Sequence, residues 1–180
     1  MSFIVIDLET TGLSSTSEVV SIAWIVLDDR LDEKERAYYI VQPDGYEIPV
    51  ESVRVHGITT EKARNEGIPF RHVCYKLGRS IYKYQCKTLV SHNIHFDRTI
   101  LVNAVYAVYQ KILARKITSL RTYCTMRKGA ELMGVKKWPK LTQLYKHLFE
   151  IDIAQNQQHH ALFDCENCAS IFKRMQNHTS

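Results

Sequence analysis

The chain has 180 residues, 45% of them apolar, and carries a net charge of +5 at neutral pH. This length is enough for one well-buried core, so we expect a single domain over residues 1–180. No run of about 18 apolar residues is present, which excludes a membrane-spanning helix, and the first apolar stretch lacks the pattern of a secretory leader. We therefore expect an intracellular protein, cytoplasmic or nuclear, that is not secreted and has no membrane partner.

The predicted elements begin with strands and continue with alternating strands and helices. Apolar or alternating runs predict strands over residues 3–8, 19–28, 36–41, 87–91 and 121–125. Helical spacing and start signals predict helices beginning near 59–62 and over 70–84, 94–114, 126–133, 141–149 and 161–176. The short connections between the early strands favour antiparallel neighbours. The order of elements predicts an α/β fold, a mixed sheet flanked by helices.

Asp7 and Glu9 stand two residues apart at the end of the first predicted strand. Side chains alternate along a strand, so both carboxylates project from the same face. A divalent cation would offset their repulsion, and Mg²⁺ prefers oxygen ligands combined with substrate phosphates. Such a pair alone is usually a solvated strand end before a turn, so the metal interpretation depends on further carboxylates.

A second candidate cluster covers residues 91–97, where a predicted strand ends and a helix begins. Ligand sites favour such strand ends. Asn93 suits an N-cap, and Asp97, one turn later, can approach the end of the neighbouring strand. The alternative for Asp97 is a solvated residue that stabilises the helix dipole.

Positive charge is concentrated between Lys111 and Lys146, where ten basic residues are accompanied by one acid, Glu131. Such a segment favours nucleic acid as a partner. Separate solvated helix faces are the alternative, because the sequence does not show that these charges share a surface.

The third candidate cluster, residues 159–164, leads into the last predicted helix. Asp164 lies beside the apolar stripe of that helix, where a carboxylate is unfavourable unless it is paired or binds metal. His159 or His160 could take a proton from an attacking water, with a surface or capping role as the alternative. The polar stretch 153–160 is expected to deliver the histidine when substrate binds.

The five cysteines are scattered and odd in number, which favours free thiols. Cys165 and Cys168 form a C-x-x-C, but a zinc ribbon needs a second such pair. Both lie on the apolar stripe of the last helix, so we expect core packing; a redox or zinc role is the alternative.

Four carboxylates and a histidine together form the set that a two-metal phosphodiester hydrolase needs. In their order and spacing, residues 7–13, 92–97 and 159–164 resemble the three motifs of the DEDDh family of 3′-to-5′ exonucleases. This DnaQ-like group includes the proofreading subunit of bacterial DNA polymerase III, epsilon, whose exonuclease domain the chain is similar to over nearly its full length. Residues 55–59 and 138–145 resemble two further stretches of the family. The resemblance implies an RNase H-like fold with a mixed five-stranded sheet.

The resemblance also implies two divalent ions, Mg²⁺ or Mn²⁺, as cofactors. It implies that Asp7, Glu9 and Asp164 bind the catalytic ion and that Asp7 also contacts the second ion. Asp97 would contribute to metal binding largely through water. His159, five residues before the last aspartate, would be the general base.

Seven further residues are implied at the terminal nucleotide: Thr10, Thr11, Leu13, His56, Ile58, Asn93 and Phe96. The two threonines would form hydrogen bonds with the nucleotide. The next three would wedge against its base without reading its identity. Asn93 and Phe96 would shape the pocket, with a helix cap and a core aromatic as the alternatives.

One position departs from the family pattern. Many relatives have a glutamate in the second strand where this chain has Ser21. That glutamate is not a principal ligand, so the change leaves the metal chemistry intact and bears on the surroundings of the site and on substrate preference.

The sequence therefore predicts a metal-dependent exonuclease that acts on single-stranded or mispaired 3′ ends of DNA and releases nucleoside 5′-monophosphates. The alternatives are an exoribonuclease or oligoribonuclease of the same family and, less favoured, a non-catalytic nucleic-acid-binding module. Expected partners are the 3′ ends of DNA or RNA and a polymerase or other replication or repair protein.

Overall fold

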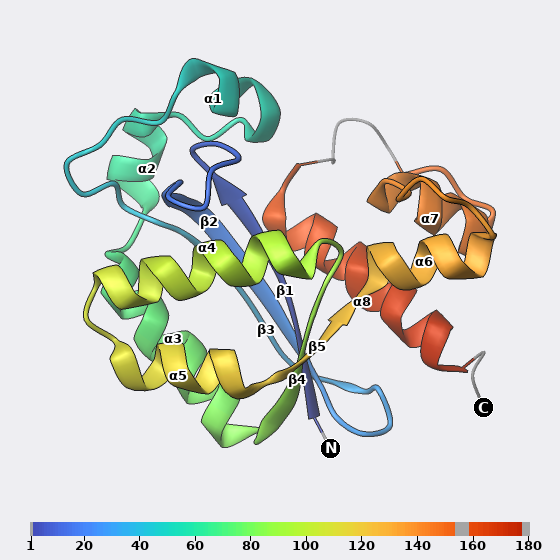
Figure 1. Ribbon diagram of the computed structural model, residues 1–180. Coiled ribbons are helices and arrows are strands. Elements are labelled where there is room, and N and C mark those ends of the chain that lie inside the picture. The colour runs from blue at the N-terminus through green and yellow to red at the C-terminus, as the bar shows by residue number, and fades with distance from the viewer. Residues whose placement is uncertain (1, 154–158, 178–180) are drawn as a thin grey trace.

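The computed structural model describes residues 2–153 and 159–177 (Figure 1). Its strands are β1 (Ser2–Thr10), β2 (Val19–Leu27), β3 (Glu33–Ile40), β4 (Cys86–Ser91) and β5 (Arg121–Cys124). Its helices are α1 (Val50–His56), α2 (Thr60–Glu66), α3 (Phe70–Lys83), α4 (Ile94–Ala107), α5 (Lys111–Ser119), α6 (Thr125–Met133), α7 (Leu141–Phe149) and α8 (Ala161–Asn177). Most of the stretch predicted to deliver the histidine, residues 154–158, lies outside the described residues. No described helix is long and apolar enough to cross a bilayer.

The strands form one five-stranded sheet in the order β3-β2-β1-β4-β5. β2 pairs antiparallel with both β1 and β3, while β4 pairs parallel with both β1 and β5. Short connections permit the antiparallel pairs, and the longer segments between β1, β4 and β5 supply the crossovers that parallel pairs need. The predicted mixed five-stranded sheet is confirmed.

The sheet has a different helical cover on each face (Figure 1). Ile4, Ile6 and Leu8 of β1 pack into a core with apolar residues of α3, α4 and α5. Val5, which projects from the opposite face, packs with buried residues of α8. Alternate residues of β1 thus pack into two different cores, one on each face of the sheet.

The prediction of one helix over residues 94–114 was wrong, because the chain breaks between α4 and α5. Tyr109 adopts a left-handed backbone conformation, with φ of 61°. The turn allows α5 to place Leu113 and Ile117 in the core that α3 also lines. The short helix α1, between Pro49 and Gly57, was not predicted.

The two cysteines of the C-x-x-C lie in α8 as buried free thiols. The Cys165 thiol donates to the carbonyl oxygen of Val5 at 3.4 Å. The Cys168 sulfur lies 3.7 Å from the Thr125 hydroxyl. Their predicted packing role is confirmed.

Candidate active site

Asp7 and Glu9 continue the row of β1 side chains that faces α8. Val5, two residues before Asp7, packs against that helix. Asp7 stays partly exposed, whereas Glu9 is buried. Across the ladder, Ala23 is paired with Asp7 and Ser21 with Glu9, so the neighbouring strand presents small side chains on this face.

Asp164 reaches the same place from the first turn of α8. One carboxylate oxygen from each of Asp7, Glu9 and Asp164 lies within 4.8 Å of the other two. The backbone N–H of His159 donates to the Asp164 carboxylate at 3.0 Å, which orients the side chain. Residues from two distant segments therefore meet, as the sequence predicted.

Asp97 approaches from the side of β4, the parallel neighbour of β1. Its buried carboxylate accepts a hydrogen bond from the Ser91 hydroxyl at the end of β4. The Ser91 oxygen in turn accepts from the backbone N–H of Asn93 at 3.2 Å. Sequence reasoning missed this function of Ser91, although its place two residues before the predicted N-cap, Asn93, was a usable signal.

The site has a strong excess of negative charge. Burial, followed by the charges of Asp97, Asp164 and Glu9, raises the pKa of Asp7 well above its usual value. Burial and the charges of Asp164 and Asp97 raise the pKa of Glu9 to about 8. Burial also raises the pKa of Asp97 and that of Asp164. Asp97 is therefore electrostatically linked to Asp7 and Glu9, although it lies outside the tight group of three carboxylates.

These carboxylates fit a divalent cation. No lysine or arginine in the described part of the chain forms an ion pair with any of them. A set of oxygen donors without a cationic partner is the environment that Mg²⁺ and Mn²⁺ prefer. A bound cation would also oppose the rise in these pKa values, because its charge favours the ionised form of each carboxyl group.

The two adjacent histidines have different surroundings. His159 is exposed and has a left-handed φ of 59°, and a positive charge on its ring would lower the pKa of both His56 and Asp164. The ring of His160 instead stacks on Tyr38, with centroids 4.7 Å apart. The His160 ring thus contacts β3, whereas the His159 side chain is exposed to solvent just before α8, the helix that carries Asp164.

The turn after β1 is held by both threonines of the first motif. The Thr10 hydroxyl donates to the Gly12 carbonyl at 2.6 Å, and the Thr11 hydroxyl oxygen accepts from the Glu18 N–H at 2.9 Å. The next side chain, Leu13, is 91% exposed. The turn therefore presents a free apolar side chain near the end of β1.

His56 and Ile58 are both buried. His56, at the end of α1, accepts a hydrogen bond on Nδ1 from the Ile58 N–H at 3.1 Å. Burial lowers the pKa of His56, and the neighbouring Thr10 backbone opposes that shift. Ile58 is 3% exposed and packs with Val20 and Ile40, so it offers almost no surface to a base. Its contact with the nucleotide stays a prediction.

The second motif begins with His92, which joins three segments of the chain. Its ring nitrogens lie 3.0 Å from the Thr125 hydroxyl and 3.0 Å from the Pro139 carbonyl oxygen. Burial lowers the pKa of His92 to about 4. Asn93 is exposed and makes no side-chain capping bond, whereas Phe96 packs against the core shared by α3, α4 and α5. The alternative of a core aromatic is thus supported for Phe96, and Asn93 stands at the N-cap of α4 without a capping bond from its side chain.

Comparison with known proteins agrees with this geometry. The sequence pattern of the exonuclease family, of the RNase T type, matches residues 4–172. The chain belongs to the exonuclease family. It is a DnaQ-like nuclease, and the three carboxylate segments all fall within the matched exonuclease region.

Relatives of this exonuclease region carry different names. The chain is 30% identical, over 179 residues, to a DNA polymerase III subunit epsilon-like protein of Rhodobacter capsulatus, covering 97% of this chain and 24% of that protein. It is 25% identical to ribonuclease T of Histophilus somni, covering 97% of this chain and 83% of that protein. The chain thus spans about a quarter of the first relative's length.

Solved structures show the same fold. Exonuclease I of E. coli, in a zinc-bound complex with single-stranded DNA, superposes with a TM-score of 0.79 at 18% identity, covering 98% of this chain and 40% of that one. Its complex with a dT13 oligonucleotide gives a TM-score of 0.81 at 18% identity, covering 97% of this chain and 41% of that one. The fold is RNase H-like, as the sequence predicted.

Proposed function

We propose that the chain is a single 3′-to-5′ exonuclease domain that removes nucleoside 5′-monophosphates with the help of two divalent ions, Mg²⁺ or Mn²⁺. The observation that carries this proposal is the convergence of Asp7, Glu9 and Asp164, with oxygens within 4.8 Å of one another and no cationic partner among the described residues. Family membership supports it, because residues 4–172 match an exonuclease.

Asp7, Glu9 and Asp164 would hold the first cation, and Asp7 would share the second. Asp97, held by Ser91, would act on the second cation through water. When bound, the two ions supply charge that activates the attacking water and stabilises the departing 3′ oxygen.

His159 is proposed as the general base. It takes a proton from the water that attacks the phosphorus, while the bond from phosphorus to the 3′ oxygen breaks and that oxygen is protonated from solvent. Its exposed imidazole can turn toward the site, and its backbone N–H is already bonded to Asp164. The same residue thus orients one carboxylate and removes the proton.

Leu13 and His56 are proposed to hold the terminal base. Apolar and stacking contacts accept any base, so hydrolysis proceeds through mixed sequences. Thr10 and Thr11 would position the sugar and phosphate from the turn that their hydroxyls already stabilise.

The first proposed substrate is DNA with single-stranded or mispaired 3′ ends. The epsilon-like relative favours it, as does the similarity to a nuclease solved with single-stranded DNA. The epsilon-like name also favours a polymerase or other replication or repair protein as partner. RNA is the second candidate, because ribonuclease T of Histophilus somni is also similar along nearly all of this chain.

The test is the release of mononucleotides from DNA and RNA strands of the same sequence, each labelled at the 3′ or the 5′ end, in Mg²⁺ and in Mn²⁺. We expect immediate mononucleotide release from the 3′ label and shortening ladders from the 5′ label, with the preferred polymer identifying the substrate. Asp7→Ala and His159→Ala should lose this activity. A wild-type protein that binds both polymers and cleaves neither would favour a non-catalytic binding module and overturn the proposal.

A further inference from the structure

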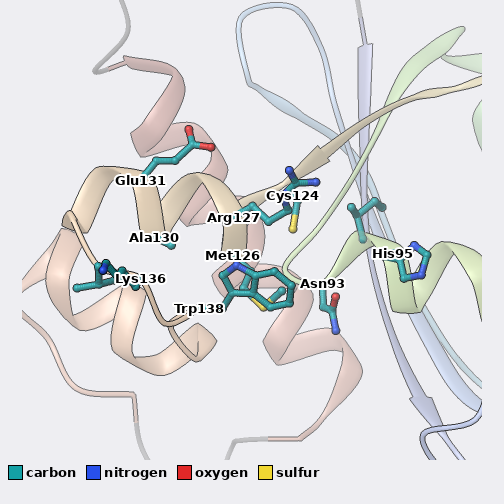
Figure 2. A pocket seen from close by; sticks show the side chains of 11 residues that line it. Asn93, His95, Cys124, Met126, Arg127, Ala130, Glu131, Lys136 and Trp138 are labelled. Carbon is teal, nitrogen blue, oxygen red and sulfur yellow. The ribbon is translucent and has the colours of Figure 1, made fainter.

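A cavity of about 550 Å³ opens beside the second motif (Figure 2). Its walls come from the start of α4, the end of β5, one side of α6 and the segment between α6 and α7. Ligand pockets in proteins commonly have volumes of about 300 to 1,000 Å³, so this cavity can admit a small organic group. The lining side chains used below are Asn93, Arg127, Glu131, Lys136 and Trp138.

Trp138 is the most informative of these side chains. Its indole is 61% exposed, whereas Trp24, the only other tryptophan of the chain, is 1% exposed. The backbone that carries Trp138 is anchored, because Pro139 is buried and its carbonyl oxygen lies 3.0 Å from His92 Nε2. An anchored backbone segment therefore carries a large aromatic ring at the cavity, and most of the surface of that ring is open to solvent.

The charge of the cavity is positive. Neither Arg127 nor Lys136 forms an ion pair with an acid in the described segments. Glu131, the one acidic side chain of the lining, is paired with Lys128 at 2.8 Å, and Figure 2 shows its carboxylate directed away from the indole. Two unpaired cations and an exposed aromatic ring thus border the same cavity.

The cavity is structurally continuous with the carboxylate site. The backbone N–H of Asp97 donates to the Asn93 carbonyl at 3.2 Å, and Asn93 and Asp97 also share Ser91 as a hydrogen-bond partner. Figure 1 shows α1, which carries His56, and α6 on opposite sides of the start of α8. A strand with its terminal base near α1 would therefore cross the carboxylates and pass the cavity.

We propose that this cavity binds an upstream nucleotide of a single-stranded substrate, with the base stacked on Trp138 and the phosphate near Arg127 and Lys136. The proposal rests on the exonuclease function given above and adds a selection for unpaired 3′ segments. Stacking on an aromatic side chain accepts any base, and unpaired cations track the phosphate backbone. Bases that are paired and stacked in a duplex are not free to enter, so single strands are favoured.

Tryptophan fluorescence tests the cavity without relying on hydrolysis. Wild-type protein in Ca²⁺ is titrated with the single-stranded pentanucleotides dT5 and U5, and with TMP and UMP as single-nucleotide controls. We expect the pentanucleotides to quench the emission and the mononucleotides, which fill only the terminal site, to leave it unchanged. Trp24→Phe should keep the quenching and Trp138→Phe should lose it.

Kinetics provide the second readout. Stacking of one base contributes enough for Trp138→Ala to raise KM for the pentanucleotide about 5- to 150-fold, with kcat nearly unchanged and partial rescue by Trp138→Phe. Replacing Arg127 and Lys136 with glutamine should reduce the salt dependence of KM. Tyr109→Ala is the matched control, because Tyr109 is a 79% exposed aromatic side chain outside the cavity.

The outcomes separate the two proposals. A protein that cleaves the pentanucleotide without fluorescence quenching, and whose Trp138→Ala variant keeps the wild-type KM, overturns the cavity assignment alone. A protein that is quenched by the pentanucleotide and never cleaves it overturns the exonuclease function and retains the cavity as a nucleic-acid site.

Discussion

Successive residues of β1 point to opposite faces of the sheet, and the two rows of side chains differ in character at the end of the strand. On the face toward α3, α4 and α5 the row Ile4, Ile6, Leu8 stays apolar to the end. On the face toward α8, Val5 is apolar and is followed by two carboxylates. The first face stabilises the fold, whereas the second carries an unfavourable concentration of negative charge, which a bound cation would offset.

The largest expected effect is on the acidic face. Asp7→Asn should lower the rate of nucleotide release at least about 10³-fold, because a bound cation contributes several kcal/mol of transition-state stabilisation. The rate is measured on a 3′-labelled strand at saturating Mg²⁺. Glu51→Gln, which neutralises an exposed acid of α1, is the control and should keep full activity. A loss of less than tenfold in Asp7→Asn would contradict the proposed ligand role.

Substitution of Ile6, the neighbour of Asp7 on the apolar face, should reduce stability and leave the catalytic rate nearly unchanged. Ile6 is fully buried, so Ile6→Ala should lower the free energy of unfolding by about 2–5 kcal/mol through lost burial and a cavity. Urea unfolding measures this change. The fraction that remains folded at low temperature should keep a kcat near that of wild type, and a large loss of kcat in folded protein would break the division between the faces.

Without metal, the charge of the acidic face should reduce stability at high pH. The folded-state pKa of Glu9 is raised to about 8 from 4.5, so the unfolded state loses its proton first. The resulting destabilisation is absent below pH 4.5, grows as the pH rises, and is complete above about 8. In chelator at pH 8, Glu9→Gln should therefore be more stable than wild type by about 1–3 kcal/mol.

Two urea series check that prediction, one in chelator and one in excess Mg²⁺. The advantage of Glu9→Gln should shrink at pH 5 in chelator and disappear at pH 8 with Mg²⁺. A variant that is less stable than wild type in chelator at pH 8 would show that repulsion does not dominate this face.

Titration of His92 should change stability less, and in the opposite direction: the free energy of unfolding should fall as the pH falls. Its folded-state pKa is lowered to about 4 from 6.5, so protons bind the unfolded state first and stability falls as the pH drops through this window. His92→Gln keeps a donor and an acceptor and removes the titration. The wild type should lose about 1–2 kcal/mol relative to this variant between pH 7 and 4.5. Parallel stability curves for the two proteins would contradict a buried neutral His92.

Much of the fold and of the acidic site could be predicted from the sequence, because the spacing of apolar residues indicates which side chains are buried. The strands and most helices agree with the sequence prediction to within a few residues. Asp7 and Glu9 could be placed on one face from their spacing alone. The convergence of Asp164 with them also followed from the family motifs, since its carboxylate lies within 4.8 Å of theirs.

The missed features depend on contacts between distant segments. Nothing in the sequence around Tyr109 marks a helix break, because no glycine or proline is present there, and the turn is stabilised by packing of α5 into the core. The Ser91 bond to Asp97 requires knowing how α4 leaves β4. The anchoring of Trp138 depends on His92, which lies in another segment of the chain.

The most direct test of the central claim is a calorimetric titration of chelator-treated protein with Mn²⁺ at pH 7.5, comparing wild type with Asp7→Asn. We predict that wild type binds Mn²⁺ and releases protons, detected by repeating the titration in buffers of different ionisation heat, and that the variant loses this binding. Equal binding by both proteins, or none by wild type, would contradict a cation site built on Asp7, Glu9 and Asp164.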